Sequence, residues 1–153
     1  MYNKILLAYD GSVEGRRALR EGAKLAQLCK AEVFLLAVVE PPIVLVTSEG
    51  GLGISMDEQI EISQGILDEG VQRLKTMGFS PTARLGTGDP GVQIADIARE
   101  INANLIVVGY RPTGPLSRWF FGSVGTYLIE HVPCSVLVGQ TEISDDQLAH
   151  AVR

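Results

Sequence analysis

The chain has 153 residues, of which 46% are hydrophobic and 20% are charged, so its composition excludes wholesale disorder and fits a domain with a buried core. The net charge of -5 repels nucleic acid and anionic lipid, so we expect neither as a partner. A phosphate site on such a chain must be local, made from backbone N–H groups and one or two arginines.

The first residues predict a soluble, cytoplasmic protein. The apolar stretch at the start reaches Asp10 too soon for a signal peptide, and it is far shorter than the ~20 residues of a membrane span. The two cysteines, Cys29 and Cys134, have no CxxC spacing and no neighbours typical of metal ligands. We therefore expect both thiols to stay reduced and to pack as small hydrophobic residues.

The first half of the chain alternates β-rich runs with segments of helical period. Strands are predicted at residues 5–9 and 33–39. Between them, one helix face is formed by small or apolar residues at i, i+3, i+4 and i+7: Leu19, Gly22, Ala23 and Ala26. A second helix has a stripe of Leu67, Val71 and Leu74, and Gly78 can close it in a left-handed conformation.

The second half repeats the alternation. Residues 82–85 alternate polar with apolar side chains, which is typical of a strand at a sheet edge. Asp89 as N-cap and Pro90 at the first helical position open a third helix with the stripe Ile94, Ile97, Ala98 and Ile101. Strands at 105–108 and 135–138 then enclose a fourth helix, which carries Phe121, Val124, Gly125 and Leu128 and stops before Pro133.

Strands separated by helices predict an α/β fold in three layers, a doubly wound sheet of five parallel strands with the third at one edge. We expect a single domain over residues 1–140. Residues 141–153 form a tail or a short terminal helix, because Ser144 and Gln147 have capping-box spacing. Residues 41–55 are an unusually long connection, of the kind that becomes a flap or a partner contact.

Ligands of such sheets bind at the carboxyl ends of the strands, where the connections change direction. The first strand ends in Ala8, Tyr9 and Asp10, and the fourth ends in Val108 and Gly109. These two ends should be neighbours.

After the fourth strand, a loop with Arg111 leads to Gly122 and Ser123, which open the next helix. A helix N-terminus with a glycine and a serine can bind phosphate through backbone N–H groups and a hydroxyl. The same residues can equally be a plain helix start with solvated arginines, and the pattern leaves both readings open. It is neither a Walker loop nor a GxGxxG fingerprint.

Several segments, in matching order from about residue 4 to 138, resemble the universal stress protein family. They are Ile5 to Ser12 (ILLAYDGS), Gly88-Asp89-Pro90, Gly109 followed by Gly122-Ser123, and the closing segment His131 to Val138 (HVPCSVLV). The resemblance implies a Rossmann-like fold, similar to the adenine nucleotide alpha hydrolases, with strand order 3-2-1-4-5. It also implies a homodimer, which we expect to form through the last strand at residues 135–138, because an apolar edge strand needs a partner.

In ATP-binding members of that family the nucleotide lies across the ends of strands one and four. The resemblance implies that Ala8, Tyr9, Asp10 and Val38 would line the base and ribose. Val108 and Gly109 would flank the sugar, and Gly122, Ser123 and Val124 would supply phosphate donors. The implied ligand is ATP or ADP. Asp10 is either a plain turn residue of Asp-Gly-Ser or an acceptor of hydrogen bonds from the nucleotide, directly or through Mg²⁺, and we expect no metal held by the protein alone.

The chain departs from the family pattern at Pro112, where a glycine belongs. Proline has no N–H and a fixed φ, so one phosphate contact is lost there. Two functions follow as hypotheses: a nucleotide-binding regulatory dimer in the stress response, or an interaction module for an unknown protein partner that binds no nucleotide. As an enzyme we expect at most slow ATP hydrolysis, because no residue is placed to orient water.

Overall fold

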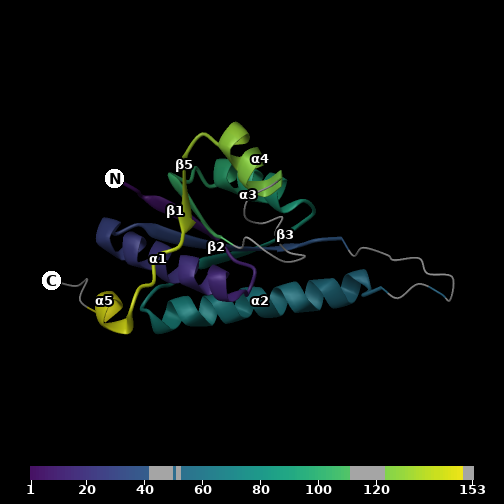
Figure 1. Ribbon diagram of the computed structural model, residues 1–153, viewed down its shortest axis with the longest axis horizontal. Coiled ribbons are helices and arrows are strands. Elements are labelled where there is room, and N and C mark those ends of the chain that lie inside the picture. Colours follow the sequence, from purple (N-terminus) through teal and green to yellow (C-terminus); the bar gives the residue numbers. More distant parts are fainter. Residues whose placement is uncertain (42–49, 51–52, 111–122, 150–153) are drawn as a thin grey trace.

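The computed structural model describes residues 1–41, 50, 53–110 and 123–149 (Figure 1). In chain order the elements are β1 (Lys4–Ala8), α1 (Val13–Cys29), β2 (Glu32–Val39), α2 (Met56–Thr76), β3 (Thr82–Thr87), α3 (Pro90–Glu100), β4 (Leu105–Gly109), α4 (Ser123–His131), β5 (Ser135–Gly139) and α5 (Asp145–Ala149). Strands and helices therefore alternate as the sequence predicts.

The five strands form one parallel sheet in the order β3-β2-β1-β4-β5. In the centre, Ile5 of β1 is in register with Val33 of β2 on one side and with Leu105 of β4 on the other. The predicted fold class and strand order are confirmed. The alternating strand β3 lies at an edge, as its polar residues predict.

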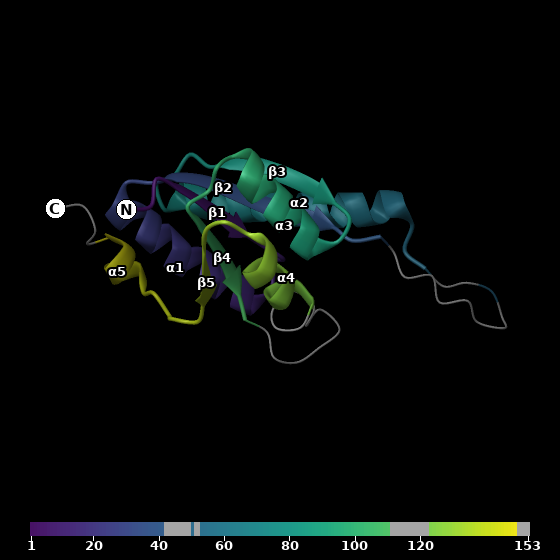
Figure 2. The same ribbon diagram turned by 90° about the horizontal axis from the view of Figure 1, so that it is seen from above.

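Two apolar clusters, one on each face of the sheet, form the core. One cluster packs under α1 and α2 and includes Leu7, Leu35 and Val107. The other packs under α3 and α4 and includes Leu6, Leu36 and Ile106. Figure 1 shows these helix pairs on opposite sides of the sheet, and Figure 2 shows α3 and α4 side by side. Adjacent strand residues thus serve different faces, as period-two alternation requires.

Local signals in the sequence start and end the helices. The side chain of Ser12 accepts a hydrogen bond from Gly15 N at the start of α1. Asp89 caps α3 in the same way, and Pro90 follows at the first helical position. Gly78 has φ +92° just after α2, the left-handed conformation predicted for it.

Glycines bring the two helices of one face close to the sheet. A Cβ at Gly22 of α1 would lie 2.5 Å from Leu7 Cδ2, and one at Gly70 of α2 would lie 2.8 Å from Leu35 Cδ2. Non-bonded Cβ atoms do not approach other atoms this closely, so a larger residue at either position would displace the leucine side chain beneath it. Gly22 belongs to the small-residue face predicted for α1.

The last described segment returns to α1. Ser144 Oγ accepts a hydrogen bond from Gln147 N, and Gln147 Oε1 accepts one from Ser144 N, at the start of α5. This reciprocal pair is a capping box. No helix in the part of the chain that the structure describes is long and apolar enough to cross a membrane.

Candidate functional site

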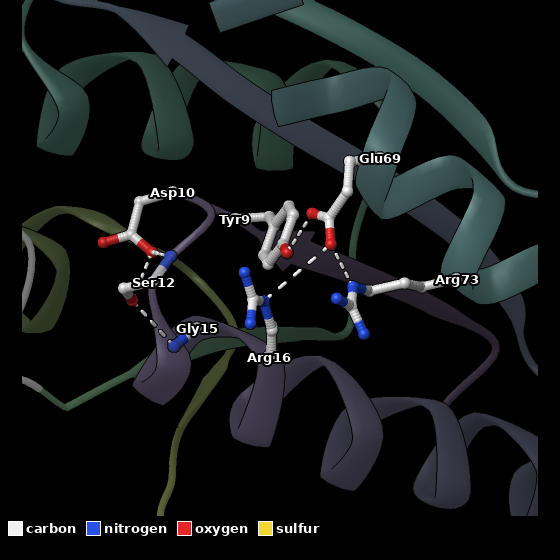
Figure 3. Close-up of polar contacts among 7 residues, drawn as sticks. All are labelled: Tyr9, Asp10, Ser12, Gly15, Arg16, Glu69 and Arg73. Carbon is white, nitrogen blue, oxygen red and sulfur yellow. Dashed lines mark hydrogen bonds and ion pairs between the residues drawn. The ribbon is translucent and has the colours of Figure 1, made fainter. Parts of the chain in front are cut away.

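The tip of β1 is a tight polar turn built around Asp10. Asp10 Oδ1 accepts hydrogen bonds from Ser12 N at 2.9 Å and from Ser12 Oγ at 2.6 Å. The same hydroxyl caps α1 through Gly15 N, so one carboxylate oxygen holds the turn and orients the helix start (Figure 3). A Cβ at Gly15 would lie 2.5 Å from Asp10 Oδ1, which shows how closely the helix backbone approaches the carboxylate.

The second carboxylate oxygen of Asp10 has no such structural duty. Among the described residues, Asp10 Oδ2 is buried and has no hydrogen-bond partner. A buried polar atom without a partner loses its hydration and gains nothing in return, a cost of about 1–3 kcal/mol or more for a charged group. Such an atom at the carboxyl end of a central strand is suited to accept a hydrogen bond, or to contact a cation, from a ligand.

Four of the predicted site residues share the sheet face that α3 and α4 cover. Ala8, Val38, Val108 and Val124 are all buried in the same apolar cluster. Asp10 lies two residues beyond the end of β1, in the turn that leads into α1. The carboxyl edge of the sheet therefore combines apolar residues at the strand ends with one buried acceptor oxygen.

Tyr9 differs from the expectation. Its side chain lies on the opposite face, 1% exposed, in the cluster under α1 and α2. The phenol hydroxyl donates a hydrogen bond to Glu69 Oε2 (Figure 3). The backbone N–H of Tyr9 donates to Leu36 O. The phenol therefore points away from Ala8, and a contact of Tyr9 with a base or ribose at this edge would come from its backbone.

Tyr9 belongs to a polar cluster that the sequence analysis missed. Glu69 Oε1 accepts a hydrogen bond from Arg73, and Arg16 Nε lies 3.8 Å from the same oxygen. Burial, and then the hydrogen bond to Glu69, raise the pKa of Tyr9 to about 12. Burial alone would raise the pKa of Glu69, but the hydrogen bonds from Tyr9 and Arg73 outweigh it and lower that pKa. The cluster joins β1 to α1 and α2 through a neutral phenol and an ionised carboxylate.

Gly109 at the end of β4 has a packing reason of its own. A Cβ there would lie 3.0 Å from Glu14 O and 3.1 Å from Gly15 N, both backbone atoms of the first turn of α1. The glycine therefore allows the start of α1 to lie against the end of β4. This contact brings the Asp10 turn next to the second strand end that the sequence analysis singled out.

The remaining predicted residues are only partly described. Arg111, Gly122 and the divergent Pro112 lie outside the described residues, and Ser123 is described only as the first residue of α4. The direction of α4 follows from its other end. His131 precedes β5, whose first residue Ser135 is in register with Leu105, the first residue of β4. Helix α4 therefore runs from the carboxyl edge of the sheet towards the amino edge.

Within the described ranges, no three His, Cys, Asp or Glu side chains lie close enough together to hold a metal ion. A cation beside Asp10 would need further ligands from a bound molecule, such as phosphate oxygens.

A doubly wound parallel sheet with an apolar wall and a buried carboxylate oxygen at its carboxyl edge defines a class, the Rossmann-like domains that bind ligands at the topological switch point. The model of the universal stress protein family matches residues 1–139, and the chain belongs to that family. A related sequence, the universal stress protein Sll1388 of Synechocystis, is 30% identical over 151 residues, which cover 91% of this chain and 98% of that protein.

Solved structures of universal stress proteins have the same fold. The universal stress protein UspA from Lactobacillus plantarum superposes with a TM-score of 0.72 at 25% identity, covering 91% of this chain and 98% of that one. The universal stress protein from Archaeoglobus fulgidus, solved in complex with dAMP, gives a TM-score of 0.67 at 25% identity, with the same coverage.

Proposed function

We propose that this universal stress protein binds an adenine nucleotide, ATP or ADP, at the carboxyl ends of β1 and β4. The observation that carries the proposal is the buried second oxygen of Asp10, which has no partner among the described residues. A ribose hydroxyl would donate a hydrogen bond to it, and a Mg²⁺ ion bound to the phosphates would neutralise it. Either contact would remove the cost of leaving that oxygen unpaired.

The surroundings of Asp10 support an adenine in particular. Ala8, Val38 and Val108 place apolar residues at the carboxyl ends of β1, β2 and β4, beside the edge at which a flat base would pack. Phosphates need N–H donors, and α4 directs its N-terminal end towards this edge. The related Archaeoglobus fulgidus protein was solved with dAMP, an adenine nucleotide, which supports the same ligand class here.

The proposal is tested by calorimetry of the full chain with ATP, ADP, AMP and dAMP, each with and without Mg²⁺. We expect saturable binding of at least one of these nucleotides, with GTP as the control for the base. Absence of binding at millimolar concentration of all four would remove the proposal.

A second candidate function, an interaction module without nucleotide, is favoured by Pro112 in the sequence. The variant Pro112→Gly separates the two candidates. If proline alone weakens a real site, the variant should bind nucleotide more tightly than the parent chain. If neither protein binds, the interaction module is the better account.

We further propose a homodimer that pairs β5 with its copy. Strand β5 is an edge of the sheet, and its residues Val136, Leu137 and Val138 are only partly buried. An apolar edge with open backbone groups is stabilised when a second strand covers it. In such a dimer, nucleotide binding in one subunit could regulate the protein through the second subunit.

The backbone of β5 offers a matched pair of variants. Ser135 N donates to Asn104 O, next to the start of β4, so by alternation the N–H of Leu137 also points to β4 and that of Val136 points outward. Val136→Pro removes only an outward donor and should give a folded monomer by light scattering. Leu137→Pro should instead unfold the edge. A wild-type chain that is monomeric at micromolar concentration would refute the dimer.

A further inference from the structure

On the sheet face that α1 and α2 cover, four arginines line a groove between α1, the C-terminal half of α2 and α5. Two adjoining cavities, of about 530 and 760 Å³, are both lined by Arg16, Arg20 and Arg73, and the second also by Arg17. Such a concentration of positive charge is unexpected on a protein of net charge -5. Two carboxylates, Glu142 and Asp145, complete the charged lining, and both belong to the segment after β5.

That segment, residues 141–149, lies in the groove as an acidic peptide would. Arg17 Nη2 contacts Glu142 Oε1 at 3.1 Å, and Arg20 Nη2 contacts Asp145 Oδ1 at 2.6 Å. Arg20 Nε also donates to the backbone oxygen of Ile143 at 2.8 Å, and Lys24 donates to a backbone oxygen further along. The groove thus binds side-chain carboxylates and peptide carbonyls together.

An apolar contact accompanies the charges. Leu148 lines the first cavity together with Leu19 of α1 and Met77 at the end of α2. Glu142, Asp145 and Leu148 are spaced three residues apart. The groove therefore fits a short segment with two acidic residues and one apolar residue at this spacing.

Residues 141–149 are held weakly enough for another segment to replace them in the groove. The side chains of Glu142 and Asp145 are 82% and 93% exposed despite their ion pairs. Exposed pairs of this kind contribute little, because water competes for both partners. Helix α5 has five residues, none of them buried, and a helix of that length is not stable by itself.

The inner end of the groove retains positive charge even with the segment in place. Arg16 and Arg73 both approach the single carboxylate of Glu69, whose other oxygen accepts from Tyr9 (Figure 3). Two guanidinium groups there share one negative charge, so a longer or more acidic segment would find an additional partner.

We propose that this groove is a docking site for an acidic segment of a partner protein, and that residues 141–149 of the chain are its intramolecular competitor. The occupant seen in the groove uses peptide carbonyls and a leucine as well as carboxylates, which favours a peptide over a phosphate polymer. The groove lies on the sheet face opposite the cluster of Ala8, Val38 and Val108.

The test measures fluorescence anisotropy of a labelled peptide with the sequence of residues 141–149, titrated with full-length protein. In the wild type, the tethered segment competes with the peptide at a high effective concentration. The double variant Glu142→Gln/Asp145→Asn weakens that competitor, and we expect it to bind the peptide about threefold more tightly, or better. The control Glu61→Gln/Glu130→Gln removes the same charge from exposed positions outside the groove and should bind as the wild type does.

Two further measurements test whether the peptide binds in the groove and whether its carboxylates are needed. Adding Arg17→Gln/Arg20→Gln to the tail variant should return the affinity to wild-type level or below, with circular dichroism as the check on folding. A peptide carrying Glu142→Gln and Asp145→Asn should bind more weakly than its parent.

Equal peptide affinity of the wild type and the tail variant would overturn the proposal, since the tail would then not compete. Displacement by tripolyphosphate or single-stranded DNA without any binding of the acidic peptide would overturn it as well, and would assign the arginines to phosphate instead.

Discussion

The hydroxyl of Tyr9 makes a prediction that can be worked out quantitatively. This phenol is buried, donates to the ionised carboxylate of Glu69, and has its pKa raised from 10.0 to about 12. A raised pKa in the folded state means that the folded protein holds the proton more tightly than the unfolded chain does. The resulting stability is fully present below about pH 10 and is lost as the pH rises towards about 12.

The size of the effect follows from the two pKa values. At about pH 11 the phenol is about ten-to-one ionised in the unfolded chain but still protonated in the folded protein. That difference amounts to about 1.4 kcal/mol of free energy of unfolding. Tyr9→Phe cannot ionise, so between about pH 9 and pH 11 the wild type should lose about 1.4 kcal/mol more stability than the variant.

Urea denaturation of both proteins at about pH 9 and pH 11 measures this difference. The lysines and the other tyrosines are the same in the two proteins, so their effects cancel in the comparison. Ultraviolet titration gives a second readout, in which one tyrosine of the folded wild type should ionise above the rest. Parallel loss of stability in the wild type and Tyr9→Phe would refute the buried hydrogen bond to Glu69.

Three further changes test the packing and charge around this cluster. The pKa of Glu69 is lowered in the folded state, so the stability that its ionised carboxylate contributes is present above about pH 4.3 and is lost as the pH falls further. Urea denaturation at about pH 5 and pH 3 should therefore show a smaller loss of stability for Glu69→Gln than for the wild type. Gly70→Ala should destabilise by about 1–3 kcal/mol, because its Cβ would lie 2.7 Å from Tyr9 Cδ1, whereas Gly65→Ala on the same helix meets open space and should stabilise by up to about 1 kcal/mol. Gly109→Ala should lower the melting temperature, because its Cβ would press on the backbone at the start of α1, and an unchanged melting temperature would contradict that contact.

Features encoded by neighbouring residues could be predicted from the sequence. The caps of α1 and α3, the closing glycine of α2 and the edge position of β3 each depend on a few adjacent side chains. The start of α2 was less visible. Helix α2 begins at Met56, well before the predicted stripe at Leu67. The sequence did not predict its first turns because Ile60 and Ile62 are exposed there, so no buried face marks the helical period. The capping box of Ser55 and Glu58 was the signal available for that start.

Features that join distant segments could not be predicted in the same way. The bond from Tyr9 to Glu69 spans 60 residues, and the contact of Arg20 with Asp145 spans 125. Nothing in the local pattern says which acid an arginine will meet. The orientation of the Tyr9 side chain could have been predicted, however, because strand alternation turns it to the face opposite Ala8. The buried second oxygen of Asp10 becomes visible only when the whole turn is assembled.

The central claim is that this buried oxygen binds an adenine nucleotide, and calorimetry of Asp10→Asn tests it most directly. Asparagine keeps an oxygen for the Ser12 turn but removes the charge, and Asp68→Asn removes the same charge from an exposed site on α2. We expect Asp10→Asn to bind ATP, ADP or AMP about tenfold or more weakly than the wild type, the loss of one charge-assisted hydrogen bond, while Asp68→Asn binds normally. Equal nucleotide affinity in Asp10→Asn and the wild type would contradict the account.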